Sequence, residues 1–135
     1  MIAPPLAGNI LGSAKGSFVV AEWSDPGGSF DPPQLIAPLH VHRNDDEAWY
    51  VLEGRLCIRS GDETIEAPAG SGVLVPRGTA HTYWNPGSEP VRYLLFMTPG
   101  ILRLIEAIHA MKDRNPQALA EVFEEHDATF IGWTI

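Results

Sequence analysis

Short runs of β-branched, aromatic and aliphatic residues recur along most of the chain, and glycine, proline or acidic residues separate them. The runs lie at residues 18–23, 35–41, 48–52, 55–59, 64–66, 73–75, 81–84 and 91–97. A spacing of roughly 8–12 residues between such runs is typical of an all-β sandwich or barrel. One run contains Pro38, which has no N–H to donate to a neighbouring strand, so we expect an edge strand or a β-bulge there.

The period of the apolar pattern changes after Gly100. Apolar residues then fall three and four positions apart, which predicts an amphipathic helix that begins at residue 101 and ends near Asn115. Asn115 and Pro116 are a favourable N-cap and first-turn pair, so a second helix should follow. The apolar face of that second helix contains Leu119, Val122 and Phe123.

The length of 135 residues and the hydrophobic content of 44% suit one domain with its own core. We place a barrel core at residues 17–98 and a helical tail at residues 101–127, within a single domain spanning 1–135. Residues 1–16 are predicted to form an N-terminal arm with few contacts to the core and at most one short strand. Residues 130–133 are predicted to form a terminal strand.

Charge and composition exclude several classes of partner. The chain has 9 Lys and Arg residues against 17 Asp and Glu residues, a formal net charge of -8. This balance argues against binding to a nucleic-acid backbone or to an anionic membrane surface. No stretch resembles a membrane span or a secretory signal, so we expect a cytoplasmic protein. A single cysteine, Cys57, excludes an intrachain disulfide and is expected to be a buried, inert thiol.

Three histidines and one glutamate are the candidate chemical centre. His40 and His42 lie two positions apart on a predicted strand, so both side chains project from the same face. Glu47 precedes the next strand and His81 opens a later one. The four side chains can meet only if the strands curl around a common interior, as in a barrel. Such a donor set suits one divalent transition metal ion, with Fe, Mn, Ni, Cu, Co and Zn all open.

The glycines and prolines around these residues match the two sequence motifs of the cupin family. The first motif is reproduced by His40, His42, Glu47 and Gly54, and the second by Gly70, Pro76, Gly78, His81 and Asn85, each at the family spacing. Gln34 stands where the first motif usually begins with a glycine, a turn position rather than a ligand. The chain therefore resembles a small single-domain cupin, which implies a mainly β fold, a jelly-roll β-barrel with about two C-terminal helices.

The resemblance also implies the site. By the family pattern, His40, His42, Glu47 and His81 would be the ligands of the metal ion. The segments PLHVHRNDDEAWYVLEG and VPRGTAHTYWN look most like quercetin-dioxygenase-like bacterial cupins. This implies a dioxygenase-type enzyme for a small, partly aromatic compound, with Glu47 as general base. The alternatives are a metal-dependent isomerase, lyase or decarboxylase of a small metabolite, and a ligand-binding cupin without turnover. Cupins also resemble one another in forming dimers, so we expect a homodimer.

Strand alternation predicts which other side chains face the site. Because residues two apart in a strand share a face, Trp49 should face inward with Glu47, and Tyr83 should face inward with His81. In the run 91–97, either the set that contains Tyr93 or the set that contains Arg92 faces inward, and the apolar set with Tyr93 is preferred. Trp49, Tyr83 and Tyr93 are therefore the candidate substrate contacts, in a pocket suited to a flat, partly apolar ligand.

Two further histidines lie in the helical tail. His126 continues the apolar face of the second helix, and His109 flanks the apolar face of the first. Both are expected to pack or cap helices, and no chemistry is assigned to them.

Overall fold

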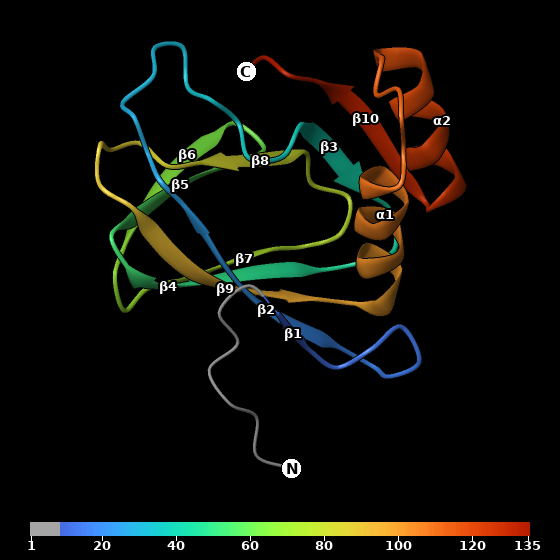
Figure 1. Ribbon diagram of the computed structural model, residues 1–135, viewed down its shortest axis with the longest axis horizontal. Coiled ribbons are helices and arrows are strands. Elements are labelled where there is room, and N and C mark those ends of the chain that lie inside the picture. The colour runs from blue at the N-terminus through green and yellow to red at the C-terminus, as the bar shows by residue number, and fades with distance from the viewer. Residues whose placement is uncertain (1–8) are drawn as a thin grey trace.

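Two five-stranded antiparallel sheets face each other in the computed structural model, which describes residues 9–135 (Figure 1). The first sheet contains, in spatial order, β1 (Ile10–Leu11), β2 (Val19–Asp25), β9 (Val91–Met97), β4 (Glu47–Glu53) and β7 (Gly72–Val75). The second contains β10 (Ala128–Gly132), β3 (Leu39–His42), β8 (His81–Trp84), β5 (Arg55–Ser60) and β6 (Glu63–Pro68). Because consecutive strands repeatedly change sheet, the arrangement is the expected jelly roll.

Side chains alternate between the two faces of a strand, so every second residue of a strand faces the space between the sheets. In β9, Tyr93, Leu95 and Met97 are buried, whereas Phe96 between them is 40% exposed. This strand lies between β2 and β4, at the centre of its sheet. The preferred inward set of this strand is thereby confirmed, because only that set places aromatic and aliphatic side chains in the space between the sheets.

A very short connection carries the chain from the first sheet to the second between β4 and β5. β4 and β5 are separated by Gly54 alone, which has φ of 76°. A Cβ atom at this position would lie 2.5 Å from the carbonyl oxygen of Pro90. Both the left-handed backbone and the close approach therefore require glycine here.

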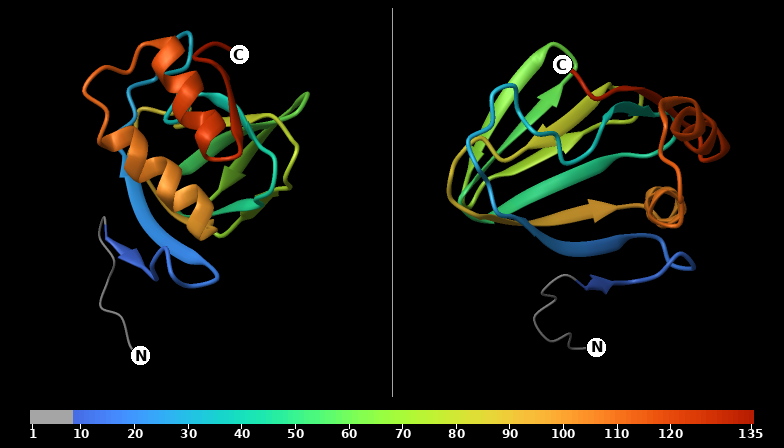
Figure 2. Two further views of the ribbon diagram at one scale, coloured as in Figure 1. Left: turned by 90° about the vertical axis from the view of Figure 1, so that its right-hand side faces the viewer. Right: turned by 45° about the horizontal axis from the view of Figure 1, so that its top comes forward.

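Two helices follow β9 and lie together at one end of the two-sheet body (Figure 2). Helix α1 (Pro99–His109) is capped by Thr98, whose hydroxyl accepts a hydrogen bond from the Ile101 N–H. Helix α2 (Pro116–Glu125) is capped by Asn115, whose side-chain oxygen accepts from the Ala118 N–H. Proline begins each helix because its missing N–H would have no partner in the first turn. A second buried cluster joins both helices to β10, formed by Leu104, Leu119, Phe123 and Ala128.

Several predicted boundaries differ from the structure. The predicted strand 35–41 is regular only from Leu39, so Pro38 precedes β3 instead of interrupting it. The first helix ends at His109 rather than near Asn115, and the terminal strand begins at Ala128. β1 provides the one short strand expected in the N-terminal arm, while residues 1–8 of that arm lie outside the described residues.

Of the two alternatives expected at Pro38, the edge strand is wrong, whereas the pairing of β10 with β3 does shift its register beside this position, between Phe130 and Gly132. β10 pairs with β3 along its outer side, with Phe130 opposite His40, and thus covers this edge. The homodimer itself stays a prediction. Within residues 9–135, no helix has the length and apolar character needed to cross a membrane.

Candidate metal centre

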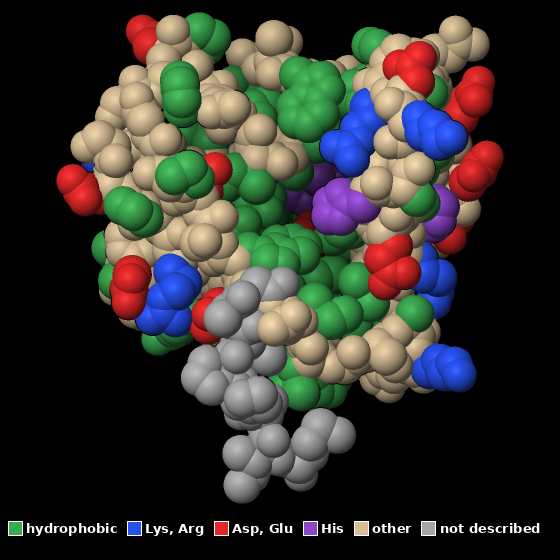
Figure 3. Space-filling model, viewed as in Figure 1, with side chains coloured by type: hydrophobic (Ala, Val, Ile, Leu, Met, Phe, Trp, Pro, Cys, Tyr) green, Lys and Arg blue, Asp and Glu red, His purple; other side chains and the backbone are tan. Residues whose placement is uncertain are grey.

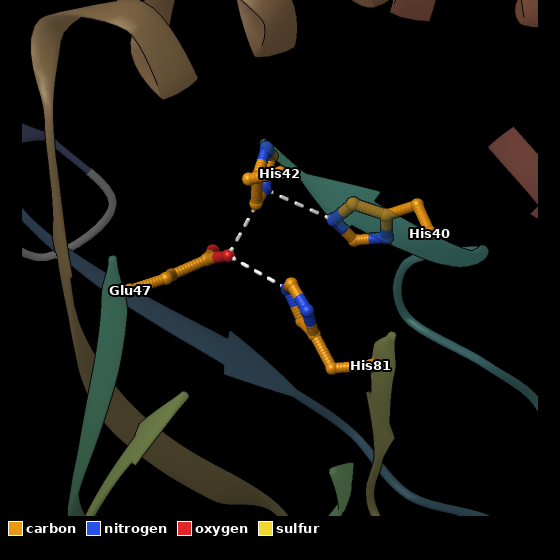
Figure 4. A group of neighbouring side chains, drawn as sticks. All are labelled: His40, His42, Glu47 and His81. Atoms are coloured by element: carbon orange, nitrogen blue, oxygen red, sulfur yellow. Dashed lines mark hydrogen bonds and ion pairs between the residues drawn. The ribbon is translucent and has the colours of Figure 1, made fainter. Parts of the chain in front are cut away.

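The four candidate donors come from three strands and from both sheets. β3 carries His40 and His42 on its buried face, and its neighbour β8 begins with His81 directly opposite His40. Glu47 is the first residue of β4, in the facing sheet. All four side chains are buried and point toward one another, so the curled sheets do bring the predicted set to one place (Figure 4).

The donor atoms converge closely. Glu47 Oε2 lies 3.2 Å from His42 Nε2 and 3.0 Å from His81 Nε2. His40 Nε2 lies 3.1 Å from His42 Nε2, and one atom from each residue lies within 4.8 Å of all the others. Atoms that share one ion at about 2.1 Å and at right angles are separated by about 3.0 Å. The spacing of these donors therefore suits a single transition metal ion.

Backbone carbonyls fix which ring nitrogens carry protons. His40 Nδ1 donates to the Pro38 carbonyl oxygen at 2.6 Å, and His81 Nδ1 donates to the Thr79 carbonyl oxygen at 2.9 Å. In the neutral rings, the Nε2 atoms then present lone pairs to the centre. A cation among them would relieve the repulsion between these lone pairs and the carboxylate, so the donor set fits a bound metal ion.

Burial and the neighbouring groups set the protonation states at the centre. Burial, with the charges of His81 and His42, lowers the pKa of His40 to about 3. Burial alone would raise the pKa of Glu47, but hydrogen bonds and charge from His42 and His81 hold it well below its usual range. Burial opposes protonation of His81, yet the hydrogen bond and the negative charge of Glu47 raise its pKa. In neutral solution, Glu47 is thus ionised and His40 is neutral, which are the forms that bind a metal ion.

The raised pKa of His81 predicts a pH-dependent metal affinity. In the metal-free protein, His81 holds a proton below a pKa that is higher than the ordinary value, and zinc must displace that proton. We therefore expect the apparent zinc affinity to fall as the pH is lowered from about 8 to about 6, by up to roughly tenfold per unit below that pKa. Competition with a chromophoric chelator at each pH measures this. A zinc affinity that does not change across the range would contradict it.

A cavity of about 340 Å³ opens beside the four donors. Figure 3 shows a hollow on this face of the molecule, with hydrophobic side chains around it and histidine within it. Three of the donors, His40, His42 and Glu47, line the cavity. Tyr83 and Tyr93 line it as well, and their hydroxyl oxygens are 3.0 Å apart.

Trp49 takes a different position from the other two predicted substrate contacts. It faces inward as alternation requires and is 1% exposed, but it does not line the cavity. Its indole packs against the rings of His81 and Tyr83, with centroids 5.8 and 5.3 Å away. In this position, Trp49 supports two side chains of the site from behind rather than contacting the cavity.

The helical tail, to which no role was assigned from the sequence, forms one wall of the cavity. Helix α1 contributes its apolar face, and α2 contributes Leu119 and Phe123. The Phe123 ring packs against His40, with centroids 5.5 Å apart. His109 and Arg114 line the same cavity. The amphipathic pattern predicts that these helices bury one face, but it does not say that the buried face borders a cavity.

Comparison with known proteins supports the same assignment. The family profile described as the cupin domain matches residues 29–97. Mannose-1-phosphate guanylyltransferase RfbM of Salmonella typhimurium is 29% identical over 86 residues, which are 64% of this chain and 16% of that protein. The chain spans between 12% and 50% of the lengths of the curated relatives it matches.

Two solved structures show the likeness in fold. A cupin protein from Bacteroides fragilis superposes with a TM-score of 0.58 at 20% identity, over 73% of this chain and 80% of that chain. A sugar phosphate isomerase from Silicibacter pomeroyi superposes with a TM-score of 0.52 at 23% identity, over 62% of this chain and 51% of that chain.

The profile match includes β3, β4 and β8, and thus all four donors. It covers just over half of the chain, from the loop before β3 to the end of β9. The matched segment, the jelly roll and the convergence of the two motifs on one point agree with one another. On these grounds, the chain belongs to the cupin family.

Proposed function

We propose that this protein is a metal-dependent oxygenase of the dioxygenase type, acting on a small, partly aromatic organic compound. The observation that carries the proposal is the position of the four donors beside a cavity whose wall is mainly aliphatic and aromatic. An apolar wall favours a planar organic ligand over a heavily hydroxylated one, because the hydroxyls of the latter would lose hydrogen bonds with water.

His40, His42, Glu47 and His81 would hold the ion. A transition metal bound there would supply positions for dioxygen and for the oxygens of an enol or catechol. The Glu47 carboxylate is ionised in neutral solution because its pKa is lowered by its histidine neighbours. A carboxylate with a low pKa is a weak base, so Glu47 could accept a proton only from an enol or phenol hydroxyl whose own pKa the bound ion would lower.

Tyr83 and Tyr93 would orient the ligand. Burial raises the pKa of Tyr83 well above its usual value, and burial is also the main cause that raises the pKa of Tyr93 to about 12. Both phenols therefore remain protonated in neutral solution. Their mutual hydrogen bond uses one of the two protons, so the other can be donated to a ligand oxygen in the cavity.

A metal-dependent isomerase or lyase of a small sugar is the second candidate. The 29% identity to a mannose-1-phosphate guanylyltransferase, a protein named for a sugar phosphate, is the observation that favours a sugar as the ligand. In this case, the ion would act as a Lewis acid toward a carbonyl group. The apolar wall of the cavity speaks against a sugar, since a sugar requires many polar partners.

The proposed activity predicts oxygen consumption. Protein loaded with iron, nickel or manganese should consume dioxygen when it is given a flavonol, a β-diketone or a catechol, as measured with an oxygen electrode. Metal-stripped protein and the Glu47→Gln variant are the controls, and both should be inactive or nearly so. Binding of these compounds without oxygen uptake would contradict the oxygenase proposal and favour a ligand-binding cupin without turnover.

A further inference from the structure

Arg114, in the connection between α1 and α2, has no ionic or hydrogen-bonding partner within residues 9–135. The other six arginines are each held by a carboxylate or a carbonyl oxygen: Arg43, Arg55, Arg59, Arg77, Arg92 and Arg103. The nearest acidic residue in the sequence, Asp113, instead accepts hydrogen bonds from the backbone and side-chain nitrogens of Asn115. The Arg114 side chain is exposed, so its guanidinium is free to bind a group of opposite charge.

This unpaired guanidinium lines the same cavity as the donors. Glu47 is the one acidic residue among the cavity-lining residues of the described chain, so no carboxylate of the wall competes for Arg114. His109, at the end of α1, is the other cavity-lining residue outside the donor set that can carry a positive charge. Figure 3 shows basic and histidine side chains together along the right-hand side of the hollow.

Helix α2 separates Arg114 from the donors by a definite length. Phe123 packs against His40, so this part of α2 marks the level of the donors. Pro116, two residues after Arg114, opens the helix. The rise between Pro116 and Phe123 is about 10 Å. Leu119 lies between these levels on the cavity side, so the wall that joins the two ends is apolar.

We propose that the ligand of this cavity is an elongated organic acid, with its chelating oxygens at the His40–His42–Glu47 end and a carboxylate bound by Arg114 at the other end. The inference rests on the proposed function and narrows its substrate class. A planar carboxylate matches the paired N–H groups of a guanidinium. The His109 ring can donate a further N–H to the same group. The apolar body of the ligand lies along α2.

Binding of matched diketone probes to the zinc-loaded protein tests this inference without turnover. The probes are benzoylacetones with a para-carboxylate, attached directly or through two methylene groups, and the methyl ester of each. We expect at least one acid to bind roughly tenfold more tightly than its ester in calorimetric titrations. Arg114→Gln should abolish that preference and leave the ester affinity unchanged.

Lys112→Gln is the matched control, because it removes the same charge only two positions before Arg114, at a residue that does not line the cavity. This variant should keep the preference for the acid. Two results would overturn the Arg114 inference while leaving the proposed function standing. One is equal binding of acid and ester to the unmodified protein for both linker lengths, and the other is a preference for the acid that survives Arg114→Gln. If neither acids nor esters bind to the zinc-loaded protein, the proposed function fails as well.

Discussion

Replacing His42 or His81 by alanine should weaken zinc binding by at least about a hundredfold. Loss of a group that merely orients a ligand typically costs 10–100-fold in metal affinity, and each of these changes removes a donor atom itself. Both rings contact Glu47 Oε2, so each variant also leaves the buried carboxylate with one fewer partner. Metal content after dialysis against a chelator, together with competition titrations, measures the effect.

The matched control for these two changes is His126→Ala. His126 caps α2, and its Nδ1 donates to the Val122 carbonyl oxygen, away from the four donors. This variant should therefore retain the zinc affinity of the unmodified protein. Thermal unfolding of all three metal-free variants separates a lost ligand from a lost fold. Full metal content in both His42→Ala and His81→Ala would show that the donor set is wrong.

The jelly roll and the donor set could be predicted because both depend on short-range patterns. His40 and His42 share a face through strand alternation, and the motif glycines and prolines mark the turns that bring Glu47 and His81 to the same place. The cupin resemblance is confirmed by the family match, whereas the special likeness to quercetin dioxygenases stays a prediction. The identity of the metal also stays a prediction, because several ions accept this donor set.

The boundaries of the cavity could not be predicted, because they depend on contacts between distant segments. The periodicity of α1 and α2 indicates an apolar face without indicating what that face covers. The pairing of β10 with β3 protects an edge that the sequence pattern leaves open, and it joins residues about 90 positions apart, such as Phe130 and His40. The roles of Phe123 and Arg114 follow from this long-range packing, and no local motif marks them.

Phe123 packs between the helical tail and the candidate metal centre, and replacing it should strongly lower the stability of the fold. Its side chain is 1% exposed, and it contacts the rings of both His40 and Phe130. Phe123→Ala should lower the free energy of unfolding by about 3–5 kcal/mol, because it leaves a cavity in the second buried cluster. Urea unfolding of the metal-free protein, followed by circular dichroism, measures this.

Phe18→Ala is the matched control, since Phe18 is 68% exposed and the same atoms are removed. It should change the free energy of unfolding by less than about 0.5 kcal/mol. The Phe123 variant should also bind zinc more weakly, because His40 loses the ring that packs against it on the side of the helical tail. Equal stability in the two variants would mean that the helical tail does not pack on the barrel as described. Lower stability with unchanged zinc affinity would mean that the donors hold their geometry without the tail.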